Sequence, residues 1–64
     1  MTKRELEVLA LLEQRLSNKE IAARLFIAPH TAKLHTLHIY QKLQVNTRRD
    51  AVAKAESLGL LASR

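Results

Sequence analysis

The sequence contains no cysteine and no tryptophan, and its 64 residues include one glycine, one proline, one phenylalanine and one tyrosine. Without cysteine, neither disulfide bonds nor thiolate metal sites can stabilise the fold. The scarcity of aromatic side chains argues against single-stranded nucleic-acid binding, in which bases stack on aromatic rings. A chain this short buries only about 60% of the surface that its unfolded form exposes, so its stability must come from good packing of one small core or from a partner subunit.

Long hydrophobic runs are also absent, and acidic residues are fewer than basic ones. No apolar segment approaches the ~20 residues that a helix needs to cross a bilayer. The first residues are charged and lead into an amphipathic segment, unlike a secretory signal peptide, so we expect a cytoplasmic protein with no membrane partner. Six Asp and Glu stand against eleven Lys and Arg, a net charge of +5. This balance favours a polyanionic partner such as nucleic acid, although many small domains are simply basic.

What the sequence does contain is helical periodicity, and the same motif marks the first two helix starts. Thr2-x-x-Glu5 and Ser17-x-x-Glu20 have the spacing of a capping box, in which each side chain bonds to the backbone N–H of the other residue. In the first helix, apolar residues follow Glu5 at positions that place this carboxylate on the same face as the core side chains. Two capping boxes before two amphipathic segments predict two separate helices.

Two further helix starts follow. Pro29 suits a first helical position, because its φ is already helical and its missing N–H would have no partner there. Asn46 or Thr47 caps the last helix. No sustained two-residue alternation predicts a strand. We therefore predict one all-α domain over residues 1–64, with helices at about 3–14, 18–25, 29–43 and 48–58.

The helix ends are unusual because glycine is nearly absent. Arg15 and Gln44 occupy positions where a left-handed glycine is usual, at a cost of about 1 kcal/mol each. Gly59 closes the last helix. Ala28 stands at the N-cap of the third helix, where a Ser, Thr, Asp or Asn would be expected.

The predicted helices have distinct faces. The third helix buries a stripe made of Ala32, Thr36, Ile39 and Leu43. Its opposite side carries His30, Lys33, Leu34, Leu37 and Gln41. The inner face of the fourth helix is predicted at Ala51, Val52, Ala55 and Leu58. The second and third helices are joined by a turn of about three residues, with Ile27 as its apolar anchor, which is the helix-turn-helix pattern.

Five segments in a fixed order carry a more specific likeness: Thr2-x-Arg4-Glu5-x-Glu7-Val8-Leu9, Leu16-Ser17-Asn18-Lys19-Glu20-Ile21-Ala22, Thr31-x-Lys33-x-His35, Ile39-Tyr40-x-Lys42-Leu43-x-Val45 and Arg48-x-x-Ala51-Val52. Together they resemble the LuxR-type (GerE-like) helix-turn-helix domain. The likeness covers nearly the whole chain, from about Met1 to Leu60. It implies a four-helix DNA-binding domain, usually the C-terminal part of a longer bacterial transcription regulator. Because Met1 stands where the family usually has leucine, we expect an excised domain of such a regulator, with a natural short protein as the alternative.

The resemblance also implies roles for individual residues. The third helix would lie in the major groove of double-stranded DNA and the fourth would form a homodimer on an inverted-repeat operator. The base-facing positions are His30, Lys33, Leu34 and Leu37. The phosphate-facing or bracing positions are Asn18, Lys19, Thr31, His35, Lys42 and Arg48. The dimer helix contributes Ala55 and Leu58.

Two pairs of residues, Leu34 with Leu37 and Glu5 with Arg48, leave alternative roles open. Leu37 stands where the family commonly has a basic or polar residue, and a leucine cannot donate a hydrogen bond to a base edge. Leu34 and Leu37 could therefore instead form an apolar patch for a partner protein. Glu5 and Arg48 could form an ion pair, as recurs in the family. The alternative is a cap contact for Glu5 and a phosphate contact for Arg48.

Chemistry at an active site is not expected. The three histidines, His30, His35 and His38, have no cysteine or nearby carboxylate to complete a metal site, so we predict neither a metal nor a cofactor. No nucleophile with a base, carboxylate pair or glycine-rich phosphate loop is present, so we predict no enzyme. We interpret the chain as a sequence-specific DNA-binding domain that could also contact RNA polymerase and associates with the nucleoid when bound. The alternatives are a domain like region four of a sigma factor and a helical protein-interaction module.

Overall fold

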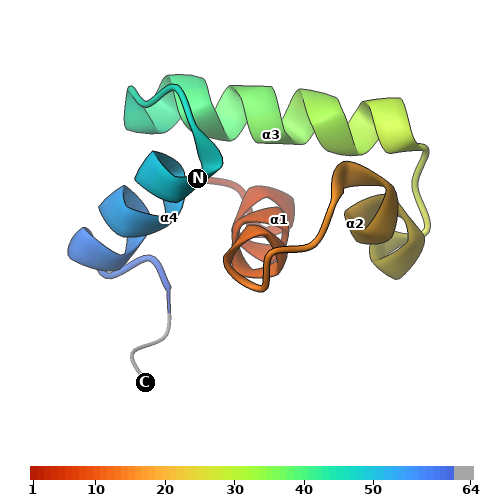
Figure 1. Cartoon of the computed structure of the whole chain (residues 1–64), viewed down its shortest axis with the longest axis horizontal. Helices are drawn as coiled ribbons and strands as arrows, with labels where there is room; N and C mark the ends of the chain where they lie inside the picture. Colours follow the sequence, from red (N-terminus) through yellow and green to blue (C-terminus); the bar gives the residue numbers. More distant parts are fainter. Residues whose placement is uncertain (62–64) are drawn as a thin grey trace.

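The computed structural model describes residues 1–61, which form four helices and no strand. Helix α1 spans Lys3–Glu13, α2 spans Asn18–Leu25, α3 spans Pro29–Leu43 and α4 spans Arg48–Ser57. Figure 1 shows α3 running along one side of the molecule, with the other three helices beneath it and α1 in the middle. The predicted all-α fold is confirmed, and α1 and α4 each end one residue earlier than predicted.

The helix starts form as the local sequence predicts. The Thr2 hydroxyl accepts from the Glu5 N–H at 3.2 Å, and the Ser17 hydroxyl accepts from the Glu20 N–H at 3.1 Å. The two carboxylates accept in return from the backbone N–H of the capping residues, at 3.0 and 2.8 Å. Thr47 caps α4 through its hydroxyl. These bonds satisfy backbone donors that the first turn of a helix leaves without partners.

All four helices of the described chain end in the same way, with a left-handed residue followed by an apolar one. The left-handed residues have φ between 57° and 74°. The N–H of the apolar residue donates to a carbonyl five residues earlier, and its side chain packs against the core. The pairs are Arg15–Leu16, Phe26–Ile27, Gln44–Val45 and Gly59–Leu60. The predictions for Arg15, Gln44 and Gly59 are confirmed, whereas a left-handed Phe26 was not expected.

The core lies where α3 crosses the other helices. Its buried side chains come from all four helices: Val8, Leu9, Leu12, Ile21, Ala22, Ala32, Ile39, Leu43, Ala51 and Ala55. The prediction that Leu58 lies on the inner face of α4 is wrong, because its side chain is 57% exposed. Leu58 keeps a right-handed helical backbone and its N–H donates to the Lys54 carbonyl at 2.9 Å, so its exposure does not come from a change of helical period. Leu60 and Leu61 pack against the core instead.

Candidate nucleic-acid interface

The outer face of α3 is open to solvent while its inner face is anchored. On the inner face Ala32 and Ile39 are fully buried, and Thr36 is buried with its hydroxyl donating to the Ala32 carbonyl at 2.9 Å. The four residues predicted to face bases are all exposed: His30, Lys33, Leu34 and Leu37. A helix fixed on one side by three neighbours therefore presents its other side as a rigid surface.

The start of α3 leaves backbone donors without a side-chain cap. Ala28 is the N-cap residue and makes no side-chain hydrogen bond, as its methyl group dictates, and Pro29 occupies the first helical position. Pro29 has no N–H and the Thr31 N–H donates to the Ala28 carbonyl at 3.0 Å, so the His30 N–H is the first-turn donor that points out of the helix start, together with the positive end of the helix dipole. Such a helix start can accept a phosphate oxygen in place of a capping side chain.

The start of α2 is joined to the middle of α3. Asn18 is half-buried, and its side-chain oxygen lies 3.4 Å from the Thr36 hydroxyl, which places it beside α3. The neighbouring Lys19 is exposed. Of these two predicted phosphate-facing residues, Asn18 is thus held by a contact between helices, whereas Lys19 extends into solvent.

Helical spacing separates the remaining polar residues of α3 into two flanks. Thr31, His35 and Lys42 recur at i, i+4 and i+11, so they follow one side of the helix. Lys33 lies on the opposite side, and the stripe that contains Leu34 runs between the two flanks. The predicted phosphate-facing residues of α3 thus share one flank, with the predicted base-facing stripe next to it.

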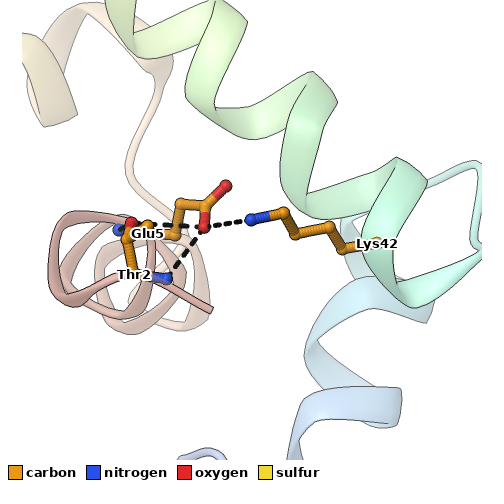
Figure 2. A network of polar contacts seen from close by, with 3 residues as sticks. All are labelled: Thr2, Glu5 and Lys42. Carbon is orange, nitrogen blue, oxygen red and sulfur yellow. Dashed lines mark hydrogen bonds and ion pairs between the residues drawn. The ribbon is translucent and has the colours of Figure 1, made fainter.

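Lys42 joins the end of α3 to the start of α1 (Figure 2). Its ammonium lies 2.7 Å from Oε1 of Glu5, and the same oxygen accepts from the N–H and the hydroxyl of Thr2. The Glu5 side chain is buried, whereas 49% of the Lys42 side chain is exposed. The hydrogen bond from Lys42, followed by that from the Thr2 backbone, lowers the pKa of Glu5 from 4.5 to about 2 despite the opposing effect of burial. Sequence reasoning placed Glu5 on the buried face but did not find Lys42 as its partner.

Arg48 does not contact Glu5 and is instead bonded to the backbone of the α1–α2 connector. Its guanidinium donates to the carbonyl of Leu16 in the connector between α1 and α2, which ties the start of α4 to that connector. The suggested ion pair between Glu5 and Arg48 is therefore wrong, and the expected cap contact of Glu5 is confirmed. Because a guanidinium has five N–H donors, the contact with Leu16 leaves others that can face a phosphate.

The two residues predicted for a dimer interface have different environments. Ala55 is fully buried in the core of its own chain, where it cannot reach a second copy. Leu58 is 57% exposed at the end of α4. The sequence pattern did not separate them because both occur at helical spacing from Ala51. Leu58 alone of this pair is placed to contact a partner.

Residues 1–61 hold no group of three His, Asp or Glu side chains arranged to bind a metal ion. None of its helices is long and apolar enough to span a membrane. An open groove between α1 and α4 is lined by both charged and apolar side chains: Leu12, Glu13, Arg15, Arg48, Arg49, Val52, Ala53 and Glu56. No residue of α3 lines this groove.

Comparison with known proteins shows the same arrangement in transcription regulators. The chain is 41% identical over 58 residues to the HTH-type transcriptional regulator MalT of Vibrio campbellii, which covers 91% of this chain and 6% of that protein. It is 41% identical over 61 residues to the oxygen regulatory protein NreC of Staphylococcus carnosus, covering 95% of this chain and 28% of NreC. The crystal structure of the response regulator ChrA of a heme-sensing two-component system superposes with a TM-score of 0.91 at 47% identity.

These relatives are much longer than the chain described here. The match to ChrA covers 94% of this chain but 30% of ChrA, so the likeness concerns one domain of each relative. The family described as bacterial regulatory proteins, luxR family, matches residues 1–55. The chain therefore belongs to the luxR family, as a four-helix helix-turn-helix DNA-binding domain of transcription regulation.

Proposed function

We propose that this domain binds double-stranded DNA at specific sequences, with α3 in the major groove. The observation that carries the proposal is the exposed stripe of α3, which is rigidly backed by the core and flanked by cationic and polar side chains. A major groove about 12 Å wide admits an α-helix. The proposed role of this surface is recognition of DNA.

Direct recognition of bases falls to the exposed start of α3. Lys33 offers three N–H donors on a flexible stem, which suit the O6 and N7 acceptors of guanine. His30 lies one turn before Leu34 on the same face, where it can add a second polar contact. Leu34 and Leu37 complete the base-facing set through apolar contacts.

Contacts with phosphates supply most of the affinity in this proposal. The residues concerned are Asn18, Lys19, Thr31, His35, Lys42 and Arg48. Glu5 engages one donor of the Lys42 ammonium, and the exposed half of that side chain leaves others for a phosphate. The uncapped start of α3 adds the backbone N–H of His30. The net charge of +5 favours the approach of a polyanion.

A dimer on DNA completes the proposed mechanism. Leu58, exposed at the end of α4, provides the apolar contact between two copies, with Ala55 supporting the helix from inside. Two α3 helices related by a two-fold axis would recognise an inverted repeat, with half-sites about one helical turn apart. Such a regulator acts in the bacterial cytoplasm on the nucleoid and can also contact RNA polymerase.

The decisive test is a titration of duplex DNA with the chain at two salt concentrations. Each phosphate contact releases counterions, so the logarithm of the binding constant should fall by about 0.9 per contact for each tenfold increase in salt. Fluorescence anisotropy of a labelled, randomised duplex pool measures this slope. Absence of salt-dependent binding to duplex DNA would overturn the proposal.

A protein-interaction module is the second candidate, and the exposed Leu34 and Leu37 favour it. The same titration separates the two functions, because binding to a protein through leucine side chains requires no affinity for duplex DNA. A domain like region four of a sigma factor would also bind duplex DNA. It would do so without the preference for an inverted repeat that a dimer imposes.

A further inference from the structure

The stripe that α3 presents has an apolar centre. His30, Leu34, Leu37 and Gln41 recur at i, i+4, i+7 and i+11 and are all exposed, so they form one line along the helix. At 1.5 Å per residue this line is about 16 Å long, comparable with the width of the major groove. The two leucines occupy its middle, with exposed fractions of 50% and 43%. Polar side chains stand only at its two ends.

Within the major groove, two adjacent exposed leucines can recognise only one kind of group. A leucine side chain has neither donor nor acceptor, so placing it against the polar edges of guanine, cytosine or adenine removes water from those groups without replacing their hydrogen bonds. The major groove contains one apolar group, the C5-methyl of thymine. Contact with that methyl group removes apolar surface from water on both partners.

We propose that Leu34 and Leu37 select thymine through its C5-methyl group, so that the preferred duplex carries thymines at the centre of each half-site. This inference rests on the proposed function, because it requires α3 to lie in the major groove. Lys33 and His30 then specify the bases at the start of the helix. The recognised half-site thus combines a polar part, read by hydrogen bonds, with a thymine-rich part, read by methyl contacts.

The test removes the methyl groups and nothing else from the major groove. Duplexes are selected from a randomised pool with this chain, and one selected duplex is made in two forms, with thymine or with deoxyuridine throughout. Both forms keep the same hydrogen-bonding groups. The wild-type chain should bind the thymine form about fourfold more tightly for each contacted methyl group, which is the hydrophobic contribution of one buried CH₂-sized group.

The leucines are then replaced to link the methyl effect to their side chains. In the double variant Leu34→Ala with Leu37→Ala, the ratio of the two affinities should fall to about one. Both side chains are about half exposed and lie outside the core, and circular dichroism checks that the helices are retained. Lys54→Ala, at an exposed position of α4 that the proposed interface does not use, should keep the wild-type ratio.

Three results would overturn the inference. Equal wild-type affinity for the thymine and deoxyuridine forms, with salt-dependent binding intact, would reject methyl recognition and leave the proposed function standing. A ratio that persists in the double variant would assign the preference to the shape of the DNA. Absence of any duplex binding would reject the proposed function and this inference together.

Discussion

At the scale of single residues, Lys33 is the test of direct base recognition. Its side chain is exposed on the flank of α3 beside the stripe that we propose faces the bases. Lys33→Ala should weaken binding to a selected duplex by about 1–3 kcal/mol and relax the preference at one base pair. Affinities for a set of duplexes with single base-pair changes, measured at one salt concentration, provide the check.

Lys54→Ala is the matched control, because Lys54 is an exposed lysine on α4 that the proposed interface does not use. It should leave the base preference unchanged. If Lys33→Ala instead weakens binding to every sequence equally and reduces the salt slope by about one, Lys33 contacts a phosphate and does not specify a base.

The charge of Glu5 contributes to stability through its contacts with Lys42 and Thr2. Because the pKa of Glu5 in the folded chain is about 2, below its ordinary value of 4.5, the unfolded chain binds the proton more readily. The stabilisation is therefore complete above pH 4.5 and is lost as the pH falls towards 2. We expect about 1–2 kcal/mol, because water screens the half-exposed Lys42.

Glu5→Gln tests this contribution, since a glutamine oxygen can still accept from the Thr2 N–H but carries no charge. Urea denaturation at pH 7 should show a loss of about 1–2 kcal/mol. The difference from the wild type should vanish as the pH approaches 2. Glu7→Gln, at an exposed position of the same helix, is the control and should leave stability nearly unchanged. A constant difference at all pH values would assign the effect to packing.

At the scale of helices, the left-handed ends are the main source of strain. Phe26 is the clearest case, because its φ is +57° and its side chain is 95% exposed. The left-handed backbone therefore raises the free energy of the folded state, and burial of the ring does not offset that increase. Phe26→Gly, Arg15→Gly and Gln44→Gly should each stabilise the fold by up to about 1 kcal/mol. Thermal and urea unfolding, followed by circular dichroism, measure the change.

Gly59→Ala provides the opposite test of the same principle. A Cβ at Gly59 would have no atom within 4 Å, so any loss of stability comes from the backbone conformation at φ +74° and not from a clash. We expect a destabilisation of about 1 kcal/mol. If the glycine substitutions destabilise and Gly59→Ala is neutral, the left-handed helix ends do not control stability in this domain.

Local signals predicted the helices well because the physical cause of each boundary lies within a few residues. The capping boxes at Thr2 and Ser17, Pro29 at the start of α3 and Gly59 after α4 all act through nearby backbone groups. The left-handed Phe26 followed the same local rule, since the apolar Ile27 comes directly after it. Attention to that repeated pattern would have identified it from sequence.

Contacts between helices were harder to predict, because they depend on how helices cross. Glu5 on an apolar face predicts a cationic partner, but the choice of Lys42 over Arg48 depends on the placement of α3 across α1. The exposure of Leu58 could not be predicted from helical spacing, because Leu58 keeps a helical backbone and yet is 57% exposed. The exposed stripe of α3 was predictable because it is the complement of a clear buried stripe, whereas its proposed contact with bases came from the family pattern.

At the scale of the whole molecule, the other three helices hold α3 on its inner side and leave its outer side exposed. One helix, α3, contacts each of the other three and carries the proposed DNA surface on its outer side. Contacts at its start, middle and end hold it: the α2–α3 turn, Asn18 on Thr36 and Lys42 on Glu5. A small core therefore suffices, because it has to orient one helix and need not enclose a pocket.

Recognition of an inverted repeat requires a dimer, because each copy of the chain has one α3 to place in the DNA. Leu58→Gln removes the exposed apolar contact at the end of α4 without changing the charge. If two copies meet there, this variant should bind an inverted-repeat duplex roughly thirtyfold more weakly, since each copy loses about 1 kcal/mol of buried apolar surface and the dimer about 2 kcal/mol. Binding to a duplex with a single half-site should remain unchanged, which separates loss of dimerisation from loss of DNA contact. Equal wild-type affinity for single and inverted sites would show that the copies bind independently, and Leu58 would then have no role in recognition.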